Sequence, residues 1–206
     1  MSSVPRPLTR AESMAETRHR LLDAALAVFA RRGYEGASVK EVAEEAGYTT
    51  GALYANFASK QALFLALLRE RFATKVADLQ AITSSADGTD LRALDERFSS
   101  LRVIEADWDL LATEFWLYAV RHDDARAPLV ERNREFRTAV AELIGANLAA
   151  AGITSATSLE TIAAAVIALG DGLGITARLE PDVVPRQLFA TATMHVVLGL
   201  ATARID

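Results

Sequence analysis

Residues 38–57 read SVKEVAEEAGYTTGALYANF, and this stretch predicts two short helices joined by a tight turn. Apolar residues recur at helical spacing in its first half, at Val39, Val42, Ala43 and Ala46. Gly47 is placed to end the first helix, because a helix C-terminus often needs a residue that tolerates positive φ. Thr49 or Thr50 is placed to cap the second helix with its hydroxyl.

The second helix of the pair has an unusual surface. Small or hydrogen-bonding residues occupy most of it, namely Thr49, Thr50, Gly51, Tyr54 and Asn56. Only Leu53 and Phe57 remain to anchor the helix inward. A helix that presents hydroxyls, an amide and a glycine outward is suited to the major groove of DNA. We therefore predict a helix-turn-helix with these five residues as DNA-binding candidates.

A longer stretch carries a family resemblance. From residue 17 to about residue 68 the chain resembles the DNA-binding region of the TetR family of bacterial one-component transcriptional regulators. The matching segments are AALAVFARRGYEGASVKEVAEEAG, TTGALYANF and SKQALFLALL. Their order, spacing and residue types agree over about fifty residues, which is far more specific than an isolated helix-turn-helix pattern.

Composition limits the remaining possibilities. The chain has 206 residues, of which 51% are hydrophobic, so it is long enough to bury a core and is not a disordered chain. It has no cysteine, which excludes disulfides and thiolate metal sites. Its first ten residues lack the apolar core of a signal peptide. The apolar stretch 161–174 contains Asp171 and is short for a membrane span. We expect a soluble cytoplasmic protein with no membrane partner.

The net charge of −5 does not settle the question of nucleic-acid binding. Residues 1–60 contain eight basic and seven acidic residues, whereas residues 61–206 contain fourteen and twenty. The acidic excess thus lies outside the predicted DNA-binding segment. An acidic protein can still bind phosphate through a local basic patch.

We divide the chain into four parts. Residues 1–10 hold two prolines and two arginines and form a flexible arm, which either enters the minor groove or has no specific role. Residues 11–58 form the three-helix DNA-binding domain, in which Gly33 ends the first helix. Residues 59–82 form a connecting helix. Residues 83–206 form a larger helical domain for ligand binding and dimerisation.

Three residues are candidates for contacts to DNA phosphates. Ser38 is an N-cap with Glu41 completing a capping box, while the resemblance implies a phosphate contact. Lys60 sits in the first turn of its helix, where the dipole disfavours cations, and this local cost suggests a nearby anion. The resemblance implies that Lys60 contacts the DNA backbone. Tyr54 is either a second phosphate contact or a packing aromatic.

The rest of the chain is predicted to be all-α, with about nine helices in total, a count that agrees with the family resemblance. Residues 83–90 form a loop, and helices follow over 91–104, 107–122, 123–151, 158–179 and 185–203. No run of alternating β-branched residues indicates a sheet.

The helix over 107–122 is rich in aromatic residues. Five residues share one face at spacings of three or four, namely Trp108, Leu111, Phe115, Tyr118 and His122. Of these, Trp108, Phe115, Tyr118 and His122 could line a small-molecule cavity or fill a core. Asp171, in an apolar segment, needs a partner if it is buried, either a cationic ligand or a structural hydrogen bond. The resemblance implies an inducer site in this domain and does not identify its lining.

The glycines and alanines of the last two helices favour close packing against a second copy. The resemblance implies a homodimer through these two helices, and a two-fold dimer would match a palindromic operator on double-stranded DNA. The resemblance alone implies a repressor that an inducer releases.

An enzyme is the alternative from another class, together with a helical interaction protein that does not bind DNA. No nucleophile–base motif is visible, the three histidines are isolated, and GDGLG at 170–174 lacks the strand that a nucleotide-binding loop requires. We expect no catalytic residues, no metal site and no cofactor.

Overall fold

The computed structural model describes residues 9–84, 106–185 and 187–203. These residues form eight α-helices and no strand, which confirms the all-α prediction. The ninth expected helix, over 91–104, lies outside the described residues. The chain divides into two compact units, one ending at Leu68 and the other beginning at Arg69.

The first unit consists of α1 (Arg10–Gly36), α2 (Val39–Glu45), α3 (Thr50–Asn56) and the beginning of α4 (Lys60–Ser84). Its core contains the apolar residues expected from helical spacing: Leu21, Leu22, Ala25, Val28, Phe29, Val42, Ala43, Leu53, Phe57, Leu63, Phe64, Leu67 and Leu68. Three aromatic rings meet at its centre, because Phe64 lies 5.3 Å from Phe29 and 5.2 Å from Tyr34 between ring centroids. This core fixes α2 and α3 against α1 and α4.

α1 differs from its predicted form. We expected Gly33 to end the helix, and Gly33 does adopt a non-helical φ of 72°. The chain then makes one further helical turn to Gly36 before the extended Ala37. The glycine therefore kinks the helix and leaves a separate last turn that carries Tyr34 and Glu35.

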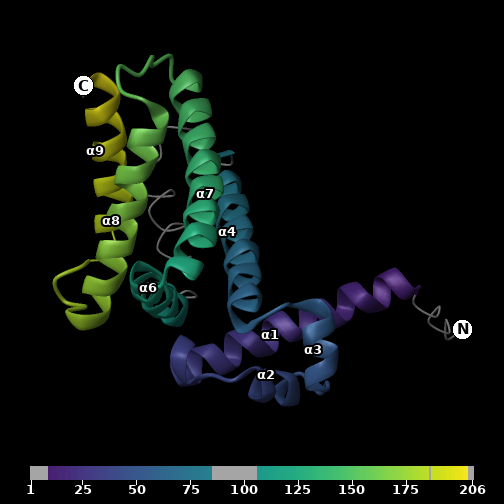
Figure 1. The fold of residues 1–206 in the computed structure, drawn as a ribbon. Coiled ribbons are helices and arrows are strands. Elements are labelled where there is room, and N and C mark those ends of the chain that lie inside the picture. The colour runs from purple at the N-terminus through teal and green to yellow at the C-terminus, as the bar shows by residue number, and fades with distance from the viewer. Residues whose placement is uncertain (1–8, 85–105, 186, 204–206) are drawn as a thin grey trace, which may run out of the picture. The chain divides into compact units, whose positions relative to one another are not determined.

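The second unit contains the rest of α4, then α6 (Ala106–Arg121), α7 (Asp123–Ala150), α8 (Leu159–Leu179) and α9 (Leu188–Thr202). α7 packs against α6 and α8, and α8 lies alongside α9 (Figure 1). Pro128 is the sixth residue of α7 and lies inside the helix, so its missing N–H removes one hydrogen bond of the helix, to the Asp124 carbonyl. Gly145 lets α7 and α8 approach closely, since a Cβ there would lie 2.7 Å from the Leu159 side chain.

α8 matches the predicted helix over 158–179 and extends beyond the apolar stretch 161–174 at both ends. By length and composition alone it is the one helix in the described ranges that could cross a membrane, although buried helices of soluble proteins pass the same test. Only 11% of its most apolar 18 residues are buried within the chain. Much of its apolar surface therefore faces outward.

Candidate nucleic-acid interface

The turn between α2 and α3 has the geometry that the sequence predicted. Gly47 has a φ of 74°, and the amide of Tyr48 donates to the Ala43 carbonyl at 2.8 Å. Thr49 is the N-cap of α3, because its hydroxyl accepts from the Ala52 amide at 3.1 Å. The two short helices are thus joined by a glycine-dependent turn and a side-chain cap, as in a helix-turn-helix.

α3 is anchored on one side and open on the other. Leu53 is fully buried and Phe57 is 4% exposed, so these two residues hold the helix on the core. Thr49 and Gly51 are exposed, Thr50 is half-buried, and the Tyr54 side chain is 53% exposed. Tyr54 therefore does not fill the core of this unit, and its hydroxyl is available on the open side.

Two arginines of α1 lie beside the two ends of α3. The guanidinium of Arg18 stacks over the Phe57 ring at 4.4 Å and donates to the Asn56 carbonyl at 3.4 Å. Arg20 lies over the Tyr48 ring at 5.3 Å. Arg18 and Arg20 are both exposed to solvent. These contacts have no local signal in the sequence, since the partners are 28 to 39 positions away.

Asn56 uses its side chain locally. Its amide donates to the Ala52 carbonyl at 2.9 Å, one turn earlier in α3, and the residue is half-buried. Such back-bonding fixes the side chain against its own helix. Asn56 is thus less open to a base edge than Thr49 or Gly51.

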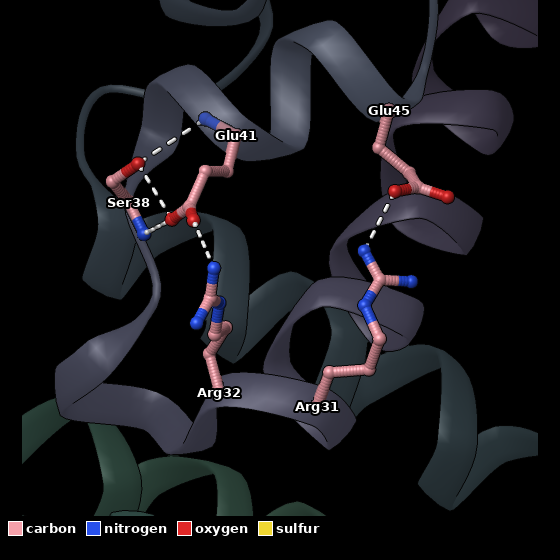
Figure 2. A network of polar contacts seen from close by, with 5 residues as sticks. All are labelled: Arg31, Arg32, Ser38, Glu41 and Glu45. Atoms are coloured by element: carbon pink, nitrogen blue, oxygen red, sulfur yellow. Dashed lines mark hydrogen bonds and ion pairs between the residues drawn. The ribbon is translucent and has the colours of Figure 1, made fainter.

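Ser38 begins α2 with the predicted capping box, which Figure 2 shows. The Glu41 amide donates to the Ser38 hydroxyl at 3.2 Å, and the Glu41 carboxylate accepts from both the amide and the hydroxyl of Ser38, at 3.0 and 2.9 Å. These hydrogen bonds, with help from Arg32 at 3.5 Å, lower the pKa of Glu41. A phosphate bound by the Ser38 hydroxyl would have to replace the Glu41 carboxylate.

A second ion pair joins the same two helices. Arg31 of α1 contacts Glu45 at the end of α2 at 2.7 Å, beside the pair of Arg32 and Glu41 (Figure 2). These side chains line an open hollow of about 600 Å³. Because both arginines face carboxylates, this hollow offers little net positive charge to a nucleic acid.

Lys60 points into the protein rather than along the surface. Its ammonium donates to the carbonyls of Tyr34, Glu35 and Ala37, at 2.9, 3.1 and 3.1 Å. It also lies 4.8 Å from the centre of the Tyr34 ring. Burial lowers the pKa of Lys60, with Glu35 opposing that effect. The electrostatic cost predicted at the start of α4 is offset by main-chain carbonyls.

The five ligand candidates of the second unit fall into two groups. Trp108 and Phe115 are 5% and 0% exposed and fill the core. Tyr118 is half-buried and stacks on the exposed His122 ring at 3.9 Å. Asp171 is solvent-accessible, yet the surrounding protein desolvates it and raises its pKa, with Lys75 acting in the opposite direction. The structure thus gives a packing role to two of the four aromatic-face residues.

Within the described ranges, no group of three or more His, Cys, Asp or Glu side chains is placed to hold a metal ion. A hollow of about 380 Å³ lies between the end of α7 and the beginning of α8, lined by residues such as Leu148, Thr154 and Ser158. It does not include the ligand candidates from the sequence.

Comparison with protein families decides the identity of the fold. Residues 21–67 match the family described as bacterial regulatory proteins, tetR family, and residues 91–201 match the BetI-type transcriptional repressor C-terminal domain. The chain belongs to the TetR family of bacterial transcriptional regulators. Its helix-turn-helix is therefore a DNA-binding element, and the regulator carries the family's C-terminal domain.

Individual relatives agree with this assignment. The regulator is 37% identical over 75 residues to the transcriptional repressor AcnR of Corynebacterium diphtheriae. That match covers 36% of the chain and only 39% of AcnR. A transcriptional regulator from Rhodococcus sp. Rha1 has a similar structure, with 30% identity, a TM-score of 0.64 and coverage of 89% of this chain and 95% of the other.

One structure of similar fold contains a ligand. FadR from Bacillus subtilis was solved in complex with stearoyl-CoA, with 16% identity, a TM-score of 0.64 and coverage of 89% of this chain and 97% of FadR. At this identity the likeness concerns the fold alone.

Proposed function

We propose that this regulator is a ligand-responsive repressor that binds a palindromic operator as a homodimer and leaves it when a small-molecule inducer binds. The observation that supports DNA binding most directly is α3, which two buried residues anchor while its hydroxyl-bearing side stays open. Repression is supported by the repressor AcnR and by the BetI-type repressor domain among the matches. Such a regulator acts in the cytoplasm, where the DNA lies.

Direct contacts to the operator come from the open side of α3. Thr49, Thr50 and Gly51 lie at its start, where they face base edges in the major groove. Tyr54 donates its hydroxyl to a phosphate oxygen. Arg18 and Arg20 add positive charge near the two ends of α3, where phosphates pass on either side of a groove.

Dimerisation is proposed to use α8 and α9. Both helices are apolar and leave large side chains in solvent, including Ile175, Leu179 and Leu198 at 37%, 76% and 42% exposure. Nothing within 4 Å would meet a Cβ at Gly172 or Gly199, so a second backbone could approach there. Exposed apolar surface of this kind marks an interaction site.

The inducer is proposed to act through α4. This helix is continuous from Lys60 in the first unit to Ser84 in the second, so it belongs to both. A ligand in the second unit changes DNA affinity only if it binds one arrangement of α4 better than another. Tyr118, His122 and Asp171 are the ligand candidates that retain solvent access, whereas Trp108 and Phe115 would shape such a site from the core.

Tyr54 gives the test of this function. The full-length regulator is expected to shift DNA that flanks its own gene in a gel-retardation assay, and Tyr54→Phe is expected to weaken binding about tenfold, the scale of a hydrogen bond to a charged group. Tyr54→Ala should weaken DNA binding by at least as much. Trp116→Ala is the matched control, because Trp116 is an aromatic residue of the second unit with a similar exposure of 52%.

Two results would contradict the proposal. One is the absence of any shift with flanking DNA or with duplexes selected from a random-sequence library. The other is unchanged binding by both Tyr54 variants, once circular dichroism shows that they are folded. The first result would favour the alternative of a helical enzyme or an interaction protein that does not bind DNA, and the second would remove Tyr54 from the proposed DNA contacts.

A further inference from the structure

Lys60 donates hydrogen bonds to main-chain carbonyls at the end of α1, where carbonyls have no donor within the helix. The last carbonyls of a helix have no intrahelical donor. Here the kink at Gly33 separates the final turn of α1, and the carbonyls of Tyr34 and Glu35 belong to that turn. An ammonium group has three N–H donors, and the three carbonyls around Lys60 match that number. All three N–H donors of the Lys60 ammonium are therefore hydrogen-bonded within the protein.

The three carbonyls lie at a joint between elements. Ala37 immediately precedes Ser38, the N-cap of α2. Tyr34 packs on Phe64 of α4, one turn beyond Lys60, with ring centroids 5.2 Å apart. One side chain therefore ties the first turn of α4 to both the last turn of α1 and the start of α2. The position of the helix-turn-helix relative to α4 depends on this connection.

We propose that Lys60 is a positioning residue for DNA binding, which holds the joint between α1 and α2 on the first turn of α4 and does not contact phosphate. This inference rests on the proposed function for its DNA-binding consequence. It reassigns the residue from the backbone contact that the family resemblance implied. A phosphate contact would require the ammonium to give up at least one of three hydrogen bonds in a half-buried site.

Stability measurements without DNA test the connection itself. Lys60→Met keeps the length of the aliphatic stem and removes all three donors. Lys60→Arg keeps the charge, but its planar guanidinium cannot direct three donors to the same carbonyls. Both variants are expected to lower the folding equilibrium constant by about tenfold or more in urea titrations, the scale of losing hydrogen bonds to a charged group. Lys40→Met is the matched control, since Lys40 is exposed and pairs only across one turn with Glu44.

Salt dependence separates positioning from phosphate contact. The probe is a duplex that the wild-type full-length chain selects from random-sequence DNA. Loss of one phosphate contact lowers the slope of log K against log salt by about 0.9. For folded Lys60→Met we expect several-fold weaker binding with an unchanged slope. In the wild type, the Lys60 ammonium should give a slowly exchanging NMR signal that is retained in the DNA complex.

The possible outcomes are distinct. A slope that falls by about 0.9, unchanged stability of the Lys60 variants, or unchanged DNA affinity of folded Lys60→Met would each overturn the inference. So would an ammonium signal that changes to a phosphate-bound form on DNA. If the wild-type chain selects no duplex, the proposed function fails instead, and the urea titrations still decide whether Lys60 holds the joint.

Discussion

The carboxylate of Glu41 joins three interactions at the start of α2. It accepts from the amide and the hydroxyl of Ser38 and pairs with Arg32 of α1. The hydrogen bonds to Ser38 are the main reason that the pKa of Glu41 lies below its ordinary value of 4.5. A single residue thus caps one helix and joins it to another.

The lowered pKa predicts a pH-dependent contribution to stability. Because the folded-state pKa lies below that of the unfolded chain, ionised Glu41 stabilises the fold above about pH 4.5, and this contribution is lost as pH falls through the folded-state pKa. Glu41→Gln should therefore lower the free energy of unfolding at pH 7, and the difference from wild type should shrink below pH 4.5. Urea titrations of both proteins at pH 7 and pH 4 measure this difference in the free energy of unfolding.

Glu44→Gln provides the comparison. Glu44 is exposed on the same helix and pairs with Lys40 at 3.7 Å, a surface contact worth at most about 0.5 kcal/mol. It should change stability little at either pH. A deficit in Glu41→Gln that persists undiminished in acid would mean that its ionisation is not what stabilises α2.

At the scale of single residues, prediction from sequence succeeded where the partner is close along the chain. The capping box of Ser38 and Glu41 spans four residues, and the structure confirms it. The destination of the Lys60 ammonium was not predictable in this way, because its carbonyl partners lie 23 to 26 positions earlier. Only the fold brings them together, and the local electrostatic cost was the one sign that a partner existed.

At the scale of elements, the turn between α2 and α3 depends on Gly47. An alanine there would have to adopt a φ near 74°, which costs about 1–2 kcal/mol for a residue with a Cβ. Gly47→Ala is therefore expected to lower the free energy of unfolding by about that amount. It should also weaken operator binding, because α3 would change its direction.

Gly51 supplies the matched substitution four residues later. A Cβ at Gly51 meets only the Thr49 hydroxyl at 3.8 Å, an ordinary contact, and the residue is helical. Gly51→Ala should raise stability by up to about 1 kcal/mol through helix propensity. Parallel urea titrations of the two variants make the comparison, and equal changes in both would refute a conformational role for Gly47.

Helix spans were largely predictable because helical periodicity and capping residues are local signals. α7 and α8 begin at or within one residue of their expected starts, and α7 ends beside Gly152, whose φ is 71°. The extra turn of α1 after Gly33 was missed, because a glycine that kinks a helix and one that ends it look alike in sequence. That turn provides two of the carbonyls that Lys60 binds.

At the scale of the whole molecule, the sequence did not separate core from site. Trp108, Phe115, Tyr118 and His122 share one helical face, yet burial decreases along it from the first two residues to the last. Periodicity shows which residues face together, and the neighbouring helices decide which of them are covered. The proposed ligand site therefore uses Tyr118 and His122 from this face, which retain solvent access, with Trp108 and Phe115 behind them in the core.

The exposed apolar surfaces of α8 and α9 lead to a prediction about assembly. Ile175→Glu on α8 and Leu198→Glu on α9 each place a charge on the proposed dimer interface, where an unpaired carboxylate is costly to bury. Each should raise the dimer dissociation constant by at least about 100-fold in sedimentation experiments, the scale of disrupting a buried interface contact.

Val130→Glu controls for the charge itself, because Val130 is 50% exposed on α7, outside the proposed interface. It should leave the dimer intact. A monomeric Val130→Glu beside dimeric α8 and α9 variants would move the interface to α7. If the α8 and α9 variants are monomeric and folded, operator affinity should fall sharply, since each α3 then binds one half-site alone and loses the gain in effective concentration that a linked pair provides.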